Sequence, residues 1–511
     1  MHPKLTLFLA AATLLPAAVP DTVKVDTGRV KGAANNGVTA FKGIPFAAPP
    51  VGPLRWKAPQ PVPAWKGVRK AVKFGPRCMQ GDIYHDMVFR DNGPSEDCLY
   101  LNVWTPAPSA AAHLPVMVWV YGGGFAAGGT SEPRQDGENL AKKGVVVVSM
   151  NYRLGVFGFF AQAELATESG HDSSGNYGLL DQVAALQWVH NNIASFGGDP
   201  GKVTIFGESA GSFSVSALMA SPVAQGLFHR AAGESGAFFS TVLALKPLSE
   251  SEAADAKFAE SVGAHSLAGL RAIPAAKLLA AALKEDDIRF APNVDGYFLP
   301  QTVREIFASG KQSHVPLMAG WNRDEGSYRI IFGKDAPTAA NFVAYARKHV
   351  PEKTDEFLKL YPGSTDEQAK RSAQDLAGDQ FIAFGTWKWL EMQGATGGSP
   401  LFRYEFDDAP PVPAKGDEAP RGAYHSAEIE FVFGTLAYHK LPWRPEDKAL
   451  SDLTSTYWSN FAKNGDPNGT GLPGWPAYNS QGRYAVMHLD ASSHEAPDDH
   501  RERYLFLDKL K

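Results

Sequence analysis

Short, nearly continuous runs of apolar residues rich in valine recur along the chain. They lie at 116–121, 145–150, 203–206, 315–320 and 401–406. Strands buried on both faces of a mainly parallel sheet have this pattern, because neither face needs polar side chains. Helices are predicted between these runs, among them 178–196 and 212–221. The order predicts an α/β fold, with a large mainly parallel sheet and helices on both faces.

Other regions depart from this pattern. Residues 23–46 alternate between apolar and polar positions and contain several glycines, which predicts short antiparallel strands at an edge of the sheet. Residues 250–400 are richer in Ala, Lys and Glu, and are predicted to be helical insertions over the sheet. The segment 409–422 is rich in proline and glycine and predicts a loop. No internal repeat divides the chain, so we expect a single domain at 21–511.

The N-terminus has the pattern of a secretory signal peptide. Lys4 precedes an apolar run at 5–15, and residues 16–20 include the small side chains that flank a cleavage point. We therefore expect residues 1–20 to be a cleaved signal peptide and the protein to be secreted or periplasmic; an uncleaved N-terminal anchor is the alternative. The run is too short to span a bilayer comfortably, and no stable membrane span is expected.

Composition narrows the functional classes. The 511 residues carry a formal net charge of −5 and no basic run, which does not favour binding to nucleic acid. The only two cysteines are Cys78 and Cys98. In an exported chain such a pair indicates one disulfide.

The sequence Gly207-Glu208-Ser209-Ala210-Gly211 carries the first chemical signal. It joins the apolar run 203–206 to the predicted helix 212–221, which is the context of a nucleophile elbow. In such a turn the serine hydroxyl is exposed above a sheet, and glycines allow close approach of the backbone. Ser209 is therefore the candidate nucleophile of an acyl-transfer enzyme.

A serine nucleophile needs a base and an acid that orients the base, and on a hydrolase sheet these follow in the order Ser, Asp or Glu, His. Asp324 and Glu325 lie just after the apolar run 315–320, where the carboxyl end of a parallel strand is expected. The residues alone do not choose between these two acids.

Several histidines follow the acid, and the order alone does not select one. They are His349, His425, His439, His488, His494 and His500. His425 is favoured, because it falls between the run 401–406 and the apolar segment 429–433, in a predicted loop.

A glycine triplet supplies candidate donors for an oxyanion. Residues 122–124 follow the predicted strand 116–121, so their consecutive backbone N–H groups are exposed where that strand ends. The N–H group of Ala210, directly after the nucleophile, is the expected second source of donors.

With these features together, the chain resembles the type-B carboxylesterases, the group that includes cholinesterases. The resemblance covers nearly the whole mature chain and rests on the motifs at 41–47, 96–103, 196–200 and 423–429 as well as the elbow. It implies the α/β-hydrolase fold with helical insertions over the active site. It also implies Ser209 as nucleophile, Glu325 as triad acid and His425 as base.

The resemblance assigns roles to further residues. Gly123, Gly124 and Ala210 match the family's oxyanion donors, and Cys78 and Cys98 match its first disulfide. The remaining matches are Glu208 and Ser235, polar residues beside the triad, and Glu96 with Arg153, a structural ion pair.

The predicted substrate pocket contains Phe125, Ile288, Tyr328 and Arg329. No tryptophan lies between the two cysteines, where cholinesterases use one to hold a quaternary ammonium group, so a choline-ester specialist is not expected. Asp286 and Ile288 fall where cholinesterases keep bulky aromatics, which predicts a wider or more polar acyl pocket. Arg329 is expected either to meet an anionic substrate group or to face solvent.

The predicted function is hydrolysis of small carboxylic esters through an acyl-enzyme, with no metal or cofactor required. One alternative is a specialised relative that acts on carbamates, amides, or polyol or mycotoxin esters, because the same triad serves all of them. Another is a non-catalytic, cholinesterase-like adhesion protein. Oligomeric state is not predicted.

Overall fold

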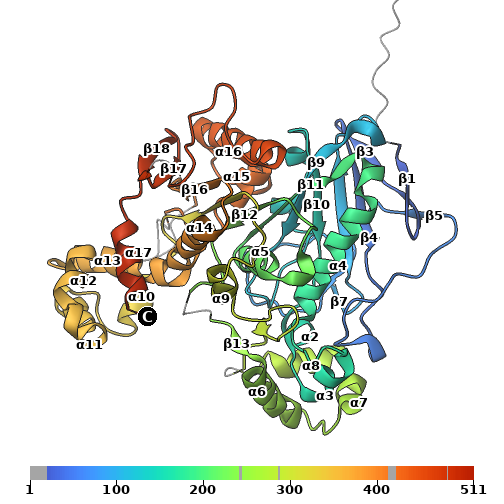
Figure 1. Ribbon diagram of the computed structural model, residues 1–511, viewed down its shortest axis with the longest axis horizontal. Coiled ribbons are helices and arrows are strands. Elements are labelled where there is room, and N and C mark those ends of the chain that lie inside the picture. Colours follow the sequence, from blue (N-terminus) through green and yellow to red (C-terminus); the bar gives the residue numbers. More distant parts are fainter. Residues whose placement is uncertain (1–19, 241–243, 286–287, 413–421, 480–481, 511) are drawn as a thin grey trace, which may run out of the picture.

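The computed structural model describes residues 20–240, 244–285, 288–412, 422–479 and 482–510. Its central element is a mixed sheet of eleven strands in the order β18-β17-β16-β15-β12-β11-β9-β10-β8-β4-β3 (Figure 1). These strands are β3 (Ala33–Asn35), β4 (Val38–Pro45), β8 (Tyr100–Thr105), β9 (Leu114–Val120), β10 (Val146–Met150), β11 (Gly198–Glu208), β12 (Arg230–Glu234), β15 (Leu317–Asn322), β16 (Leu401–Phe406), β17 (Ala485–Leu489) and β18 (His494–Pro497).

The middle of the sheet is parallel and its margins are antiparallel. From β10 through β9, β11, β12, β15 and β16 to β17, each neighbouring pair is parallel. Strands β3, β4 and β8 at one margin, and β18 at the other, pair antiparallel. The five apolar runs correspond to β9, β10, β11, β15 and β16, so the mainly parallel sheet is confirmed, as is the antiparallel extension of its edge within residues 23–46.

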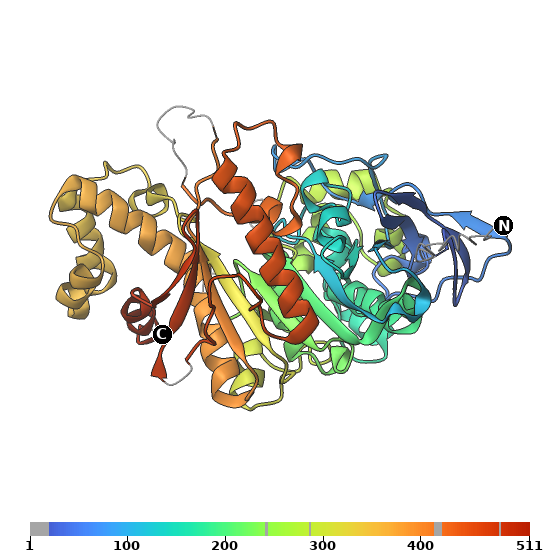
Figure 2. The same cartoon turned by 90° about the horizontal axis from the view of Figure 1, so that it is seen from above.

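Helices cover both faces of the sheet, as two consecutive residues of β12 show. A Cβ atom at Gly233 would lie 2.3 Å from the ring of Trp389 in α14 (Phe384–Thr396). The next side chain, Glu234, accepts a hydrogen bond of 2.7 Å from Trp458 in α16 (Pro445–Asn464). Because adjacent residues of a strand point to opposite faces, α14 and α16 lie on opposite sides. Figure 2 shows α16 crossing the strands.

The remaining helices include two groups away from the sheet centre, α6 to α8 and α10 to α13 (Figures 1 and 2). Residues 250–400 are therefore not one continuous helical insertion, because β15 runs between the two groups as a central strand. The other helices are α1 (Glu138–Ala141), α2 (Gly155–Phe159), α3 (Ala163–Ser169), α4 (Tyr177–Asn192), α5 (Ala210–Ala220), α6 (Leu248–Ser261), α7 (Leu267–Ala272), α8 (Ala275–Ala282), α9 (Val303–Ala308), α10 (Tyr328–Phe332), α11 (Ala339–His349), α12 (Thr354–Leu360), α13 (Asp366–Gly378), the π-helix η7 (Asp379–Ala383), α15 (Ile429–Phe433) and α17 (Arg501–Asp508).

Small sheets and one disulfide complete the described part. The small sheets are β1 (Thr22–Val25) with β2 (Gly28–Lys31) and β5 (Val68–Lys70), β6 (Arg77–Cys78) with β7 (Pro94–Ser95), and β13 (Lys246–Pro247) with β14 (Asn293–Val294). A disulfide joins Cys78 and Cys98, as predicted. Among the described residues, no helix has the length and apolarity to cross a membrane. Residues 1–19 of the predicted signal peptide, Asp286 and most of the predicted 409–422 loop fall outside the described residues.

The predicted ion pair between Glu96 and Arg153 is wrong. Glu96 instead accepts two hydrogen bonds from Arg55, at 2.6 and 2.7 Å. Arg153 donates to both carboxylate oxygens of Asp181, at 2.8 and 2.7 Å. Asp181 is fully buried on α4, which packs beside the segment that follows β10. Each arginine thus has its own two-point carboxylate partner, a geometry that favours arginine strongly.

The turn from β11 into α5 is packed against β9. A Cβ atom at Gly211 would lie 1.9 Å from the carbonyl oxygen of Val120, and one at Gly207 would lie 2.6 Å from the same oxygen. Contacts this short involve backbone atoms, so rotation of a side chain cannot relieve them. Glycine at both positions is therefore a condition for this turn.

We expect Gly211→Ala to lower the free energy of unfolding by about 3 kcal/mol, because the added methyl group must push α5 away from β9. Chemical denaturation followed by tryptophan fluorescence measures this. The matched control is Gly474→Ala, since a Cβ atom there meets nothing within 4 Å. Equal stability of the two variants would show that the contact with Val120 does not require glycine at position 211.

Candidate active site

Ser209 lies at the sharp turn between β11 and α5, with φ +52° and ψ −122°. A positive φ is strained for a residue with a side chain, and it is held here because the Ser209 N–H group donates to the Glu234 carbonyl oxygen at 2.9 Å. The turn ends β11, a strand that is buried over its last residues. The serine is thus displayed at the carboxyl end of the sheet, where ligands of open α/β sheets bind.

Two loops bring an imidazole and a carboxylate to this serine. His425 lies between β16 and α15, and its Nε2 atom is 3.0 Å from Ser209 Oγ. Glu325 follows β15, and its Oε2 atom is 3.4 Å from His425 Nδ1. The three side chains are more than 200 residues apart at the extremes, yet they meet because all three carrier segments leave the same end of parallel strands.

Glu325 is itself held by donors from neighbouring strands. Its Oε1 atom accepts a hydrogen bond of 2.5 Å from the Ser235 hydroxyl and one of 2.9 Å from the Asn322 N–H group. Ser235 follows β12 directly and has φ +59°. Both donors act on one oxygen, which leaves Oε2 directed at the imidazole.

A second carboxylate, Glu208, lies beside the imidazole, with its Oε1 atom 3.3 Å from His425 Nε2. Burial raises the pKa of Glu208, although the charge of His425 opposes that shift. Burial alone would lower the pKa of His425, but the carboxylates of Glu208 and Glu325 outweigh it and raise that pKa. The site therefore stabilises an imidazolium, the form that a general base takes during reaction.

Backbone amides of Gly123, Gly124 and Ala210 are grouped beside Ser209 on the wall of one cavity. Gly123 has φ +109° and Gly124 φ +63°, conformations that only glycine adopts easily. Within the described ranges, none of these three amides donates to a protein acceptor. They are therefore suited to an oxygen anion of a ligand.

The cavity at Ser209 has a volume of about 520 Å³ and a mostly apolar wall. Phe125, one of the predicted pocket residues, lies on that wall. The sequence did not predict the other large apolar residues of this wall, which are Met87, Phe213, Phe238, Leu245 and Phe381.

Phe381 belongs to the π-helix η7, and its ring centroid lies 5.4 Å from that of His425. Phe213 lies within α5, where an apolar residue indicates only a buried helix. Neither residue stands out in sequence, because apolar residues of a cavity wall follow the same periodicity as the core.

The other predicted pocket residues, Ile288, Tyr328 and Arg329, do not line this cavity. Tyr328 and Arg329 begin α10, which packs on α13, and the ring of Tyr328 lies 4.6 Å from the ammonium group of Lys370 in α13. Arg329 is exposed, and Ile288 packs against the hydrophobic core. The cationic side chains on the cavity wall are Arg134, Lys246 and Arg289.

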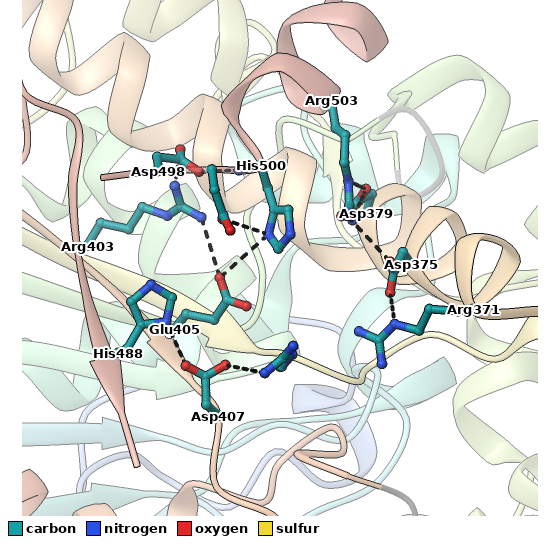
Figure 3. Close-up of polar contacts among 12 residues, drawn as sticks. Arg371, Asp375, Asp379, Arg403, Glu405, Asp407, His488, Asp498, His500 and Arg503 are labelled. Carbon is teal, nitrogen blue, oxygen red and sulfur yellow. Dashed lines mark hydrogen bonds and ion pairs between the residues drawn. The ribbon is translucent and has the colours of Figure 1, made fainter. Parts of the chain in front are cut away.

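A cluster of charged residues lies on β16, α13, η7 and the C-terminal segment (Figure 3). Arg503 contacts Asp379 at 2.6 Å and Asp375 at 3.5 Å, and Asp375 also binds Arg371 at 2.8 Å. Nearby, the buried Arg403 pairs with Asp498. Glu325 lines a small cavity of about 20 Å³ together with several members of this cluster, which include Asp375, Asp379 and Arg503.

Within the described ranges, no group of three or more histidine, cysteine, aspartate or glutamate side chains could hold a metal ion.

Comparisons with known proteins identify the family of the chain. The family model described as "Carboxylesterase family" matches residues 19–505. Carboxylesterase 1D of Rattus norvegicus is 39% identical, covering 97% of this chain and 94% of its own. Fumonisin B1 esterase of Sphingopyxis macrogoltabida is 36% identical, covering 96% and 91%. A solved structure named PNB esterase superposes with a TM-score of 0.81 at 35% identity, covering 96% of this chain and 99% of that one.

The sheet is thus that of the α/β-hydrolase fold, and the match extends over nearly the whole chain. The chain belongs to the carboxylesterase family and is a serine hydrolase of carboxylic esters.

Proposed function

We propose that this protein hydrolyses small carboxylic esters through an acyl-enzyme on Ser209. His425 Nε2 takes the hydroxyl proton as Ser209 attacks the ester carbonyl carbon, and the same proton passes to the leaving alcohol. Water then attacks the acyl-enzyme, with His425 again as base, and releases the acid. The observation that carries this proposal is the 3.0 Å contact between Ser209 Oγ and His425 Nε2.

The supporting groups have separate roles in this proposal. Glu325 orients the imidazole and stabilises its charged form, and the Ser235 hydroxyl keeps the carboxylate in place. The N–H groups of Gly123, Gly124 and Ala210 donate hydrogen bonds to the oxyanion of the tetrahedral intermediate. They stabilise the transition state more than the substrate, because the ester carbonyl oxygen of the substrate carries less negative charge.

The cavity supports an ester with at least one apolar substituent. Phenylalanine side chains on its wall bind aliphatic or aromatic groups through burial of apolar surface, and a volume of about 520 Å³ admits a small molecule. Amides and carbamates use the same nucleophile, so a turnover screen with matched ester, amide and carbamate substrates decides between a general esterase and the specialised alternatives.

We also propose export through a signal peptide at 1–20, with residues 21–511 as the mature single domain. The disulfide between Cys78 and Cys98 supports this, because disulfides persist in oxidising compartments.

We expect Ser209→Ala to abolish turnover of a short-chain aryl ester, with a fall of at least about 1,000-fold in kcat/KM, because among the described residues no other hydroxyl bonds to His425 Nε2. Hydrolysis is measured by release of the aryl alcohol. The control is Ser109→Ala, an exposed serine remote from the cavity. Retained activity in Ser209→Ala would overturn the assignment of the nucleophile.

A fluorophosphonate probe gives an independent measurement of the same group. Mass spectrometry should locate a single covalent adduct on Ser209 of the wild-type protein. The non-catalytic adhesion alternative requires that no adduct form there.

We expect Glu208→Gln to move the acid limb of the kcat/KM profile to lower pH by about one unit, or about 1.4 kcal/mol. The base must be neutral, so activity rises as pH passes the pKa of His425, and removal of a nearby carboxylate lowers that pKa. The maximal kcat should also fall, because the imidazolium loses a stabilising charge. Full pH profiles measure both effects.

The matched control for this variant is Glu446→Gln, an exposed glutamate in the first turn of α16. A limb that stays in place, or moves to higher pH, in Glu208→Gln would show that Glu208 does not act on the base.

A further inference from the structure

Asp324 connects three segments at the rear of the site. Its Oδ1 atom accepts a hydrogen bond of 2.7 Å from Arg371 on α13, and its Oδ2 atom accepts one of 3.1 Å from the Ala423 N–H group. Its own N–H group donates to the Ala423 carbonyl oxygen at 3.0 Å. One residue thus binds the loop after β15 both to α13 and to the loop that carries His425.

The bonds of Asp324 lie close in sequence to two members of the triad, Glu325 and His425. Asp324 directly precedes Glu325, and Ala423 is two residues before His425. The two bonds between Asp324 and Ala423 therefore lie within two residues of each member of the acid–base pair. They restrict the separation between Glu325 Oε2 and His425 Nδ1, which is 3.4 Å.

Close packing around Asp324 restricts movement of the loop that carries Asp324 and Glu325. A Cβ atom at Gly422 would lie 2.1 Å from Asp324 Oδ2, and Gly422 has φ +64°. On the other side, a Cβ atom at Gly326 would lie 2.1 Å from the Gln374 carbonyl oxygen. The acid loop is therefore pressed between the histidine loop and α13.

Helix α13 is itself a fixed support. Arg371 also binds Asp375, and Arg503 of α17 binds Asp375 and Asp379 (Figure 3). The side chains of Arg503, Asp375 and Asp379 are mostly buried, so solvent weakens the two Arg503 pairs less than a surface pair, whereas the side chain of Arg371 is exposed. They join the end of α13 and the start of η7 to α17.

We propose that Asp324 is a positioning residue, which holds Glu325 and His425 at the distance and angle that the reaction needs. The proposal rests on the triad proposed above. Asp324 suits this role because a carboxylate has two acceptor oxygens and here each serves a different segment. Glu325 carries the charge that the imidazole meets, and Asp324 joins the two loops that bring them together.

The test is Asp324→Asn, which keeps the size of the side chain but replaces one acceptor oxygen by a donor NH₂ group. Active sites are first counted with a fluorophosphonate probe. We expect kcat per labelled site to fall about tenfold with KM for a neutral aryl ester unchanged, since a small misplacement of a catalytic group costs rate rather than binding. The acid limb should also move to lower pH, because a misplaced Glu325 supports the charged imidazole less.

Two further variants keep the test decisive. Arg371→Gln removes the bond from Arg371 to Asp324 Oδ1 and the pair with Asp375, but leaves the 3.4 Å bond from Gln374 of α13 and the bonds to Ala423. It should lower kcat per labelled site less than Asp324→Asn does. It is used in place of Asp324→Asn if that variant does not fold. Asp335→Asn is the matched control, an exposed aspartate just after α10, and should leave kcat and the pH profile unchanged.

Wild-type kcat per labelled site and an unshifted acid limb in both Asp324→Asn and Arg371→Gln would overturn the proposal, even if their thermal stability fell. Failure of the triad proposal has a different signature, since the wild-type protein would then show no fluorophosphonate adduct on Ser209.

Discussion

The close approach of three backbone segments at the end of β11 determines where the chemistry can occur. Gly207 and Gly211 both lie against the carbonyl oxygen of Val120 on β9, with no room for a side chain at either position. Three residues lie between these glycines, and the middle one, Ser209, makes the sharp turn with a strained positive φ and lines the cavity. The strain is offset by the surrounding sheet, in which the neighbouring strand β12 accepts the Ser209 N–H group.

Electrostatics then determine how that hydroxyl is activated. Burial disfavours every charge in the site, so an imidazole placed there alone would be a weak base. Two carboxylates within 3.4 Å of His425 reverse this effect. Burial raises the pKa of Glu208, and the charge of His425 opposes that shift, so the Glu208 carboxylate and the imidazolium stabilise each other's charged form.

Much of this arrangement could be predicted from sequence, for physical reasons that differ among elements. Strands β9, β10 and β16 are recognisable because they are buried on both faces and have long apolar side chains. Strand β12 is not, because its sequence Arg-Ala-Ala-Gly-Glu is dominated by small residues. Those residues are small because α5 and α14 approach closely: the position of Gly233 is filled by the ring of Trp389. A strand of small residues such as β12 can therefore be recognised only once the helices that pack on it are known.

The residues of the pocket wall also could not be predicted from their distance along the sequence. Arg329 follows the predicted acid closely in sequence, yet α10 packs on α13 and Arg329 does not line the cavity. Phe381, 56 residues beyond Glu325, does line it, because the π-helix η7 brings its ring next to that of His425.

Sequence proximity also failed to separate Asp324 from Glu325, since both are acids in the same turn. In the fold their side chains face different partners: Glu325 meets the imidazole, and Asp324 meets Arg371 and the backbone of the histidine loop. A pair of adjacent acids at a strand end can therefore divide the work, one supplying charge to the base and the other fixing the two loops that bring charge and base together.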